Sequence, residues 1–219
     1  MEYETRAIIL NRQDINEYDE IISALSENGK ITFFAPGVRK STSKNNLNLQ
    51  LYSLVNLEII ESKQKKLMPR LKRASLIKQI PINIMLKREY DDIKYFFSKI
   101  TSSTKALIII DAFLECIDYL AEAKNKVISY LLYKIIKVEG LAPRFDGCVE
   151  CQRKEHLVDF EFHRGGFLCT FHSQSSKSIS LLRSLYWLNT TYTSFSDSCS
   201  FYDASLIRKM LIQYLIEVI

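Results

Sequence analysis

The sequence predicts an α+β protein, in which a small barrel of five strands is followed by an α-helical domain that carries a metal-binding hairpin. Three observations support this class. Residues 1–80 contain short runs rich in β-branched and aromatic side chains, which favour strands. From Pro81 onward, apolar residues recur three and four positions apart, as they do in amphipathic helices. Three cysteines and a histidine form two close pairs between residues 148 and 172.

The expected strands are short and closely spaced. They lie at residues 4–11, 18–27, 29–36, 49–62 and 67–78. Asn28 and Gly29, between the second and third strands, are the residue pair preferred in tight hairpin turns. Five short strands within 80 residues suit a small closed barrel such as an OB-fold. We therefore expect an OB-fold nucleic-acid-binding domain over residues 1–80, with its boundary between Gln79 and Ile82.

The remainder of the chain is expected to be helical and to form one domain over residues 81–219. The apolar spacing predicts helices at 82–100, 105–123, 126–140, 179–188 and 204–219. Gly140 and Pro143 mark the end of the third helix. A segment without helical periodicity, at about residues 144–174, interrupts this domain and contains the cysteine and histidine pairs.

These pairs predict a structural zinc site. Cys148 and Cys151 form C-x2-C, and Cys169 and His172 form C-x2-H after seventeen intervening residues. Two residues between ligands let both side chains face one tetrahedral ion, and thiolates with imidazole suit zinc. Because four protein ligands leave no position for a catalytic water, this Zn²⁺ is expected to stabilise the fold. The alternating sequence DFEFH and the turn at Gly165-Gly166 indicate a small hairpin closed by the metal.

Other interpretations of the same residues stay open. They could be ordinary buried thiols, the remains of a lost metal site or, less favoured, a disulfide. His156 and His163 flank the hairpin and could replace His172 as a ligand, although only His172 completes a pair with two-residue spacing. Cys116 lies outside the pattern, in an apolar helical stretch, and is expected to be a buried small side chain.

Positive charge is concentrated in the barrel. The whole chain has a formal net charge of +5, whereas residues 29–80 contain eleven Lys or Arg against two acids, Glu58 and Glu61. Such a segment favours phosphate binding with release of counterions, and the neighbouring Ser and Asn side chains could add neutral hydrogen bonds to phosphate. The alternative is an ordinary solvated face. The candidate DNA contacts are Lys30, Arg39, Lys40, Lys44, Lys63, Lys65, Lys66, Arg70, Lys72 and Arg73.

Aromatic residues of the barrel could stack on nucleobases. Phe33, Phe34 and Tyr52 are the candidates, although aromatic residues on strands usually belong to the core. Because Phe33 and Phe34 are adjacent on one expected strand, at least one of them must point inward.

No enzyme motif accompanies this charge. The chain lacks the phosphate-binding GxxxxGK[ST] and GxGxxG motifs, the metalloprotease HExxH and the nucleophile elbow GxSxG. The paired acids Asp91 and Asp92 are interpreted as surface residues of a helix.

The N-terminal residues have no run of signal-peptide length, and the longest apolar stretches are too short to span a bilayer. We therefore expect a cytoplasmic, non-enzymatic protein with no membrane partner, and in a reducing compartment thiol pairs favour metal over disulfide.

The order of several motifs resembles that of the bacterial RecO recombination mediators, over nearly the whole chain. The matching residues are Gly29-Lys30, Ala35-Pro36-Gly37-Val38-Arg39-Lys40, Ser43-Lys44, Gly140-Leu141-Ala142-Pro143, Cys148–Cys151 and Gly165–His172. The resemblance implies a protein that binds single- and double-stranded DNA and anneals complementary strands. It also implies action with RecR on DNA coated by the single-strand binding protein SSB, where RecO-like proteins help load RecA in homologous recombination and gap repair.

The resemblance also implies roles for individual residues. Arg39, Lys40 and Lys44 match the basic loop that such proteins use on DNA. Relatives that keep metal ligands hold zinc with four cysteines, whereas here His172 takes the fourth position. The family docks the acidic, apolar C-terminal tail of SSB on its helical domain. Lys126, Lys134 and Lys137 are the candidate cations for that tail, with a solvated helix face as the alternative.

Two further functions remain as alternatives. An RNA-binding OB-fold protein would prefer structured RNA to single-stranded DNA. An interaction scaffold that works through its zinc hairpin would show no salt-sensitive binding to nucleic acid.

Overall fold

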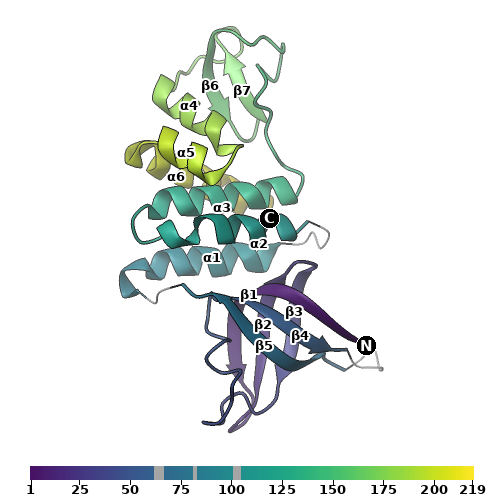
Figure 1. Cartoon of the computed structure of the whole chain (residues 1–219). Coiled ribbons are helices and arrows are strands. Elements are labelled where there is room, and N and C mark those ends of the chain that lie inside the picture. The colour runs from purple at the N-terminus through teal and green to yellow at the C-terminus, as the bar shows by residue number, and fades with distance from the viewer. Residues whose placement is uncertain (62–66, 81–82, 101–104) are drawn as a thin grey trace. The chain divides into compact units, whose positions relative to one another are not determined.

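A computed structural model describes residues 1–61, 67–80, 83–100 and 105–219 of the chain (Figure 1). These residues divide into two compact units, Met1–Leu114 and Glu115–Ile219. Each unit is described by itself below.

The first unit contains a closed five-stranded barrel. Its strands are β1 (Glu2–Asp14), β2 (Glu20–Ser26), β3 (Gly29–Ala35), β4 (Leu54–Ile60) and β5 (Arg70–Lys78). Around the barrel they follow the order β1-β2-β3-β5-β4, and β4 returns to β1 in antiparallel register. β3 and β5 pair in parallel at Phe34 and Arg70. The prediction of an OB-like barrel is confirmed.

The sequence explains how the barrel closes. Gly29 has a φ of 97°, which allows the tight turn between β2 and β3. β1 is long enough to pair with both β2 and β4, and its register shifts between Ile9 and Asn11. A bulge of this kind bends a strand, as a small barrel requires. Phe33 is fully buried in the core and Phe34 is half-buried, so one of this adjacent pair does point inward.

The expected strand at 49–62 is shorter than predicted. β4 begins at Leu54, because residues 45–53 fold into a series of turns. Leu49 inserts into the barrel core, and Tyr52 has a φ of 64°, which an extended strand cannot accommodate. This long loop between β3 and β4, residues 36–53, is called the basic loop below because it carries Arg39, Lys40 and Lys44.

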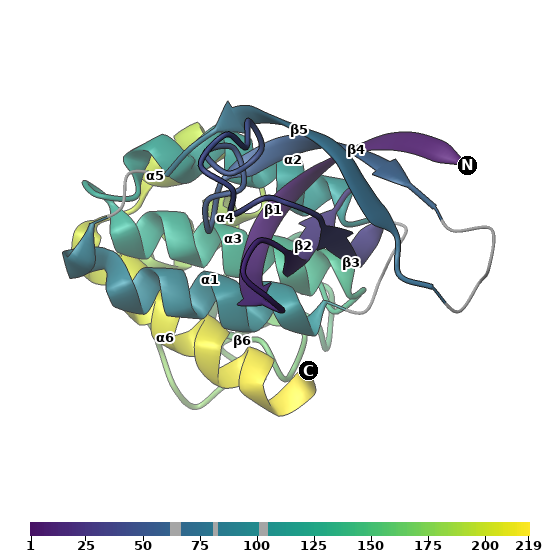
Figure 2. The ribbon, with the colours of Figure 1, turned by 90° about the horizontal axis from the view of Figure 1, so that it is seen from below.

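Helices complete the first unit. Asn83 caps a short 3₁₀ turn (Ile84–Leu86), and α1 (Lys87–Lys99) follows it. α1 packs against β1, as the view in Figure 2 also shows. Lys94 of α1 donates a hydrogen bond to the Asn11 side chain at 3.1 Å, and Lys30 of β3 donates to the Ser98 carbonyl at 3.0 Å. α2 (Leu107–Cys116) begins in this unit, and it ends earlier than the predicted 105–123 helix because a 3₁₀ turn (Ile117–Tyr119) follows.

The second unit is built around a buried helix. Its further elements are α3 (Lys124–Val138), β6 (Leu157–Glu161), β7 (Gly166–Cys169), α4 (Ile179–Leu188), α5 (Tyr192–Ser198) and α6 (Phe201–Val218). α3 packs against α5 and α6 and is buried along most of its length. Gly140, with a φ of 78°, follows the end of α3, as its sequence predicts.

Helix α5 was not expected from the sequence. Its residues are mostly polar, and only Tyr192 and Phe195 face the core. The Thr191 hydroxyl accepts a hydrogen bond from the Ser194 backbone N–H and so caps its N-terminus. α6 begins at Phe201, before the predicted start at residue 204, because Ser200 caps it in the same way.

In the part of the chain that the structure describes, no helix combines the length and the apolar character needed to cross a membrane.

Candidate nucleic-acid interface and metal centre

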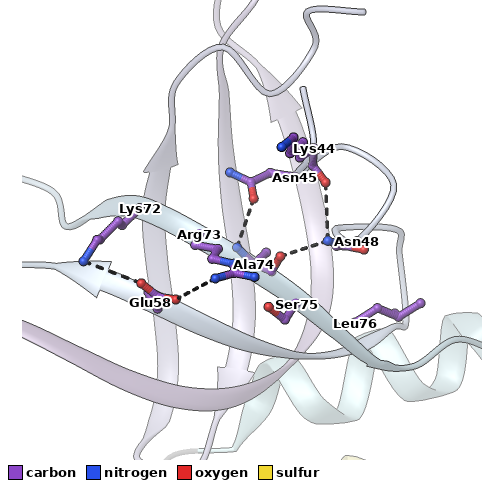
Figure 3. Close-up of a pocket in the computed structure, with 9 residues that line it drawn as sticks. All are labelled: Lys44, Asn45, Asn48, Glu58, Lys72, Arg73, Ala74, Ser75 and Leu76. Atoms are coloured by element: carbon purple, nitrogen blue, oxygen red, sulfur yellow. Dashed lines mark hydrogen bonds and ion pairs between the residues drawn. The ribbon is translucent and has the colours of Figure 1, made fainter. Parts of the chain in front are cut away.

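A groove of about 970 Å³ lies between the basic loop and β5 of the barrel (Figure 3). The residues that line it come from the basic loop, β4 and β5. They are Lys44, Asn45, Asn48, Glu58, Lys72, Arg73, Ala74, Ser75 and Leu76.

Two asparagines fix the basic loop to β5. The Asn45 side-chain oxygen accepts a hydrogen bond from the Ala74 backbone N–H at 3.0 Å. The Asn48 side-chain amide donates to the Ala74 carbonyl at 2.9 Å and to the Lys44 carbonyl at 3.3 Å. Both backbone groups of Ala74 thereby find partners outside the strand ladder with β4. The loop is part of the barrel wall, and Lys44 is held beside the cations of β5.

The groove is positive, with one acid inside it. Arg73 is 69% exposed, and its guanidinium lies 4.0 Å from the Glu58 carboxylate. The Lys72 ammonium lies 2.6 Å from Glu2 and 3.6 Å from Glu58. The hydrogen bond that Lys72 donates to Glu2 raises the pKa of Lys72, so this side chain stays charged. Exposed ion pairs of this kind are weak, and a phosphate could replace Glu58 as the partner of both cations.

The other predicted DNA contacts lie elsewhere on the barrel. Arg39 pairs with Asp14 at 2.9 Å and donates to the Asn16 carbonyl at 3.1 Å, so it is tied to the loop between β1 and β2. The Lys40 ammonium lies 5.4 Å from the centre of the Tyr18 ring in the same loop.

The carboxylate of Asp19 lies close to these cations at the β1–β2 loop. Hydrogen bonds from Asn16 and from the Gly37 N–H lower the pKa of Asp19, and the positive charges of Lys40 and Arg70 lower it further. Lys30 lies apart from both regions, against α1. Lys63, Lys65 and Lys66 fall outside the described residues.

The four predicted metal ligands come together in the second unit. The ligand atoms of Cys148, Cys151, Cys169 and His172 all lie within 4.8 Å of one another. The His172 Nδ1 atom is 3.6 Å from the Cys148 sulfur and 3.3 Å from the Cys169 sulfur, and the Cys151 and Cys169 sulfurs are 3.7 Å apart. In a tetrahedral zinc site, bonds of about 2.3 Å to sulfur and about 2.0 Å to nitrogen place neighbouring ligand atoms about 3.5–3.8 Å apart. The donor set and its spacing fit zinc.

Local structure prepares these ligands for a cation. Burial raises the pKa of Cys148, but hydrogen bonds from the backbone N–H groups of Cys151, Cys169 and Glu150 outweigh it and lower that pKa to about 6. Cys148 and Cys169 are buried, whereas Cys151 is exposed at the rim. β6 and β7 form the expected hairpin, with Gly165 and Gly166 in its turn at positive φ.

A buried carboxylate holds the segment that follows the ligands. Asp159 of β6 accepts hydrogen bonds from the side chains of Ser173, Ser175 and Lys177. Burial opposes the ionised form of Asp159, yet these donors, led by Lys177, lower its pKa to about 2.

The helix lysines expected at a partner site differ from one another. Lys134 is only 8% exposed. Its ammonium lies 4.2 Å from the centre of the Tyr130 ring and donates to the Thr190 carbonyl at 3.3 Å. Burial lowers the pKa of Lys134 to about 8. Lys126 donates to the Ser196 carbonyl and lies over the exposed ring of Phe201, and Lys137 is exposed. Only Lys126 and Lys137 therefore offer a cation at the surface.

Sequence reasoning missed the residues that shape the groove. Asn45 could bond phosphate only through its side-chain NH2, because its side-chain oxygen already accepts the Ala74 N–H. Asn48 and Glu58 carried no prediction as site residues. The only signal available was the asparagine-rich run at 45–48, which is typical of turns in which side chains bond the backbone.

Comparison with known proteins agrees with the barrel and the motif order. The family model of the N-terminal domain of recombination protein O matches residues 1–80. The chain is 26% identical to a DNA repair protein RecO of Mesoplasma florum over an alignment of 182 positions, which covers 77% of this chain and 66% of that protein. It is 25% identical over 174 residues to a DNA repair protein RecO of Bacillus cereus, with 78% and 70% of the two chains covered. The chain thus spans about two thirds of the length of these relatives. The predicted resemblance is confirmed: residues 1–80 match the N-terminal domain of recombination protein O, and the chain is similar over most of its length to DNA repair proteins named RecO.

Proposed function

We propose that this chain is a non-enzymatic recombination mediator that binds single- and double-stranded DNA and anneals complementary strands. In this role it would help load RecA on SSB-coated DNA during homologous recombination and gap repair. The observation that carries the proposal is a groove lined by Lys44, Lys72 and Arg73 on a barrel that matches the N-terminal domain of recombination protein O.

The mechanism follows from the charge of this groove. Cations that neutralise the phosphates of a strand release its condensed counterions, and the reduced charge lowers the repulsion between two bound strands. Contacts to phosphate leave the base edges free to pair. Arg39, Lys40 and Arg70 lie near the β1–β2 loop together with the acids Asp14 and Asp19. A second strand or a longer stretch of the first could bind to these cations.

Zinc is the proposed cofactor, with a structural role. Cys148, Cys151, Cys169 and His172 would hold it and so close the hairpin of β6 and β7. The metal would supply free energy of folding to the second unit, because the apolar cluster at the ligands is small and consists of Cys148, Leu168 and Cys169 with the half-buried Val149 and Leu157.

The proposed macromolecular partners are DNA, RecR and the C-terminal tail of SSB, with RecA acted on indirectly. Lys126 and Lys137 remain as the cations for the SSB tail. Lys126 is the stronger candidate, because its ammonium lies 4.8 Å from the centre of the exposed Phe201 ring, which gives an acidic, apolar tail both of the contacts it needs. These partners act on nucleoid DNA, so we place the protein in the cytoplasm.

The test replaces Lys44, Lys72 and Arg73 with alanine and measures binding to single-stranded DNA across a salt series. We expect weaker binding to all sequences alike, and a salt dependence flattened by about 0.7 per lost phosphate contact. The matched control replaces three exposed cations outside the groove, Lys105, Arg183 and Lys209. Annealing of complementary oligonucleotides, bare and coated with SSB, should slow in parallel with the loss of binding.

Three results would contradict parts of this proposal. Equal affinities for the groove variant and the control variant would remove the groove as the interface. A preference for structured RNA over single-stranded DNA would favour the RNA-binding alternative, and folded protein without salt-sensitive binding would favour the scaffold.

A further inference from the structure

We propose that the ring of Tyr52, packed on one face against the buried Tyr90, forms a stacking site for one unpaired nucleobase of a strand bound in the groove beside the basic loop. This inference rests on the proposed function, because the groove must bind the phosphates of the same strand. The first unit would then recognise single-stranded nucleic acid, because only an unpaired base can turn away from its neighbours and stack on a tyrosine.

The two rings line a small apolar pocket. Their centroids are 5.1 Å apart and their planes differ by 18°. With Arg12, Gln50, Leu51 and Ile80 they enclose a volume of about 260 Å³. Sites for drug-sized ligands measure about 300–1,000 Å³, so this pocket suits a smaller flat group. Aromatic rings bind any nucleobase by stacking, because every base has a π-face.

The backbone holds Tyr52 in a conformation that favours this exposure. Its φ of 64° is uncommon for a residue other than glycine and persists only when the surroundings enforce it. The Tyr52 N–H donates to the Ile9 carbonyl at 2.8 Å. The turn is therefore fixed to β1, and the half-buried Tyr52 ring lies against Tyr90 rather than in the barrel core.

A second anchor fixes the same loop. Arg12 donates to the Leu49 carbonyl at 3.2 Å and to the Asn46 side chain at 2.9 Å. Its guanidinium also forms a bidentate pair with the buried carboxylate of Glu20, at 2.7 and 2.9 Å. The loop is held from the β1–β2 side by Arg12 and from the β5 side by Asn45 and Asn48. A rigid aromatic platform of this kind loses little entropy when a base stacks on it.

The position of the pocket beside the groove identifies the occupant. Lys44, Asn45 and Asn48 of the basic loop line the groove, and Gln50, Leu51 and Tyr52, directly after them, line the pocket. Along the other wall, Leu76 of β5 lines the groove and Ile80 lines the pocket. These residues are four positions apart, or about 13 Å in an extended chain. A strand with its phosphates on Lys44 and Arg73 reaches the tyrosine pair within a few nucleotides.

The experiment separates stacking from phosphate binding. Affinity is measured for an oligothymidylate and for an oligomer of the same length and charge in which every base is replaced by an abasic site. The proteins compared are the parent, Tyr52→Ala, Tyr52→Phe and, as a matched control, Tyr95→Ala, which removes an exposed tyrosine of α1 outside the pocket. We expect Tyr52→Ala to weaken binding of the intact oligomer by at least about 5-fold, and to leave binding of the abasic oligomer unchanged. Tyr52→Phe and Tyr95→Ala should both bind like the parent.

The outcomes are distinct. If Tyr52→Ala weakens neither oligomer, or weakens both equally, the stacking site is rejected while the proposed DNA-binding function stands. If the parent binds neither oligomer, the function and the site fall together. Should Tyr52→Ala fail to fold, the parent is titrated with an oligomer carrying the fluorescent base 2-aminopurine. Quenching on binding supports stacking, and binding with undiminished fluorescence overturns it.

Discussion

The side chain of Asn48 joins the basic loop to strand β5 by donating a hydrogen bond to the Ala74 carbonyl at 2.9 Å. Asn45 completes the connection by accepting the Ala74 N–H. A loop of eighteen residues between two strands would ordinarily move independently of the barrel, and these two bonds tie its cation Lys44 to the position of Arg73.

Because of this connection, we expect the uncharged residue Asn48 to affect DNA affinity. Replacing Asn48 with alanine should lower the free energy of unfolding by about 1 kcal/mol, because the Ala74 carbonyl loses its donor. Affinity for single-stranded DNA should fall as well, since Lys44 is no longer held beside β5. Chemical denaturation and fluorescence anisotropy measure the two quantities. Asn56→Ala is the control, because Asn56 also makes a side-chain hydrogen bond, to Glu4, but lies outside the groove. Unchanged affinity for Asn48→Ala would show that the loop does not need this bond to bind DNA.

Glu58 is expected to oppose nucleic-acid binding. Its carboxylate is the acid that lines the groove and lies within 4.0 Å of both Lys72 and Arg73. Replacing it with glutamine removes that charge and keeps the size of the side chain, so DNA affinity should rise, and most at low salt, where charge is least screened. Asp197→Asn, an exposed acid of the second unit, makes the same change in net charge. Equal gains in the two variants would mean that net charge, and not the groove, determines affinity.

The buried ammonium of Lys134 should make the free energy of unfolding of the second unit depend on pH. Burial lowers its pKa to about 8, below the value of about 10.4 for an unfolded lysine. Between these values an unfolded lysine binds more protons than the folded one, so the contribution of Lys134 to the free energy of unfolding should rise as pH increases from 8 toward 10. Below pH 8 both states are protonated, and the cost of burying the charge is fully present.

The variant Lys134→Met tests this charge directly. Methionine keeps the apolar stem without the ammonium, so stability at pH 7 should be equal to or greater than that of the parent. The increase between pH 8 and 10 should disappear. Lys209→Met, an exposed lysine of α6, should leave the pH profile unchanged. A strongly destabilised Lys134→Met would instead show that the contacts of the ammonium with Thr190 and the Tyr130 ring outweigh its desolvation.

Lys134 also shows what a sequence can and cannot predict here. Helical periodicity correctly placed it in a helix, but periodicity does not say how many neighbours will cover that helix. α3 is buried on nearly all of its surface by α5 and α6, and α5 itself was missed because its core contacts are only Tyr192 and Phe195 in a polar segment. The exposed cation that was expected at residue 134 is therefore interior.

The groove and the metal centre differ in how far along the sequence their determining residues lie from one another. Cys148, Cys151, Cys169 and His172 could be predicted because ligand chemistry and spacing act over a few residues. The barrel could be predicted because alternation and the Asn28-Gly29 turn are local signals. The groove could not, because it requires Asn48 to meet Ala74 across 26 positions. Side chains of the basic loop carry no periodicity that reveals such a partner.

The metal centre gives the last prediction. Replacing Cys169 with serine removes a buried ligand, so the purified protein should contain no zinc and its second unit should unfold at lower temperature. Apparent binding free energies of structural zinc sites reach about 10–16 kcal/mol, which exceeds the stability of most small domains. Cys199→Ser is the matched control, because Cys199 is also buried but lies outside the ligand set. It should keep one zinc ion per chain, measured by mass spectrometry of the metal. A Cys169→Ser protein that kept its zinc, or that melted like the Cys199→Ser protein, would show that the hairpin does not depend on this tetrahedral site.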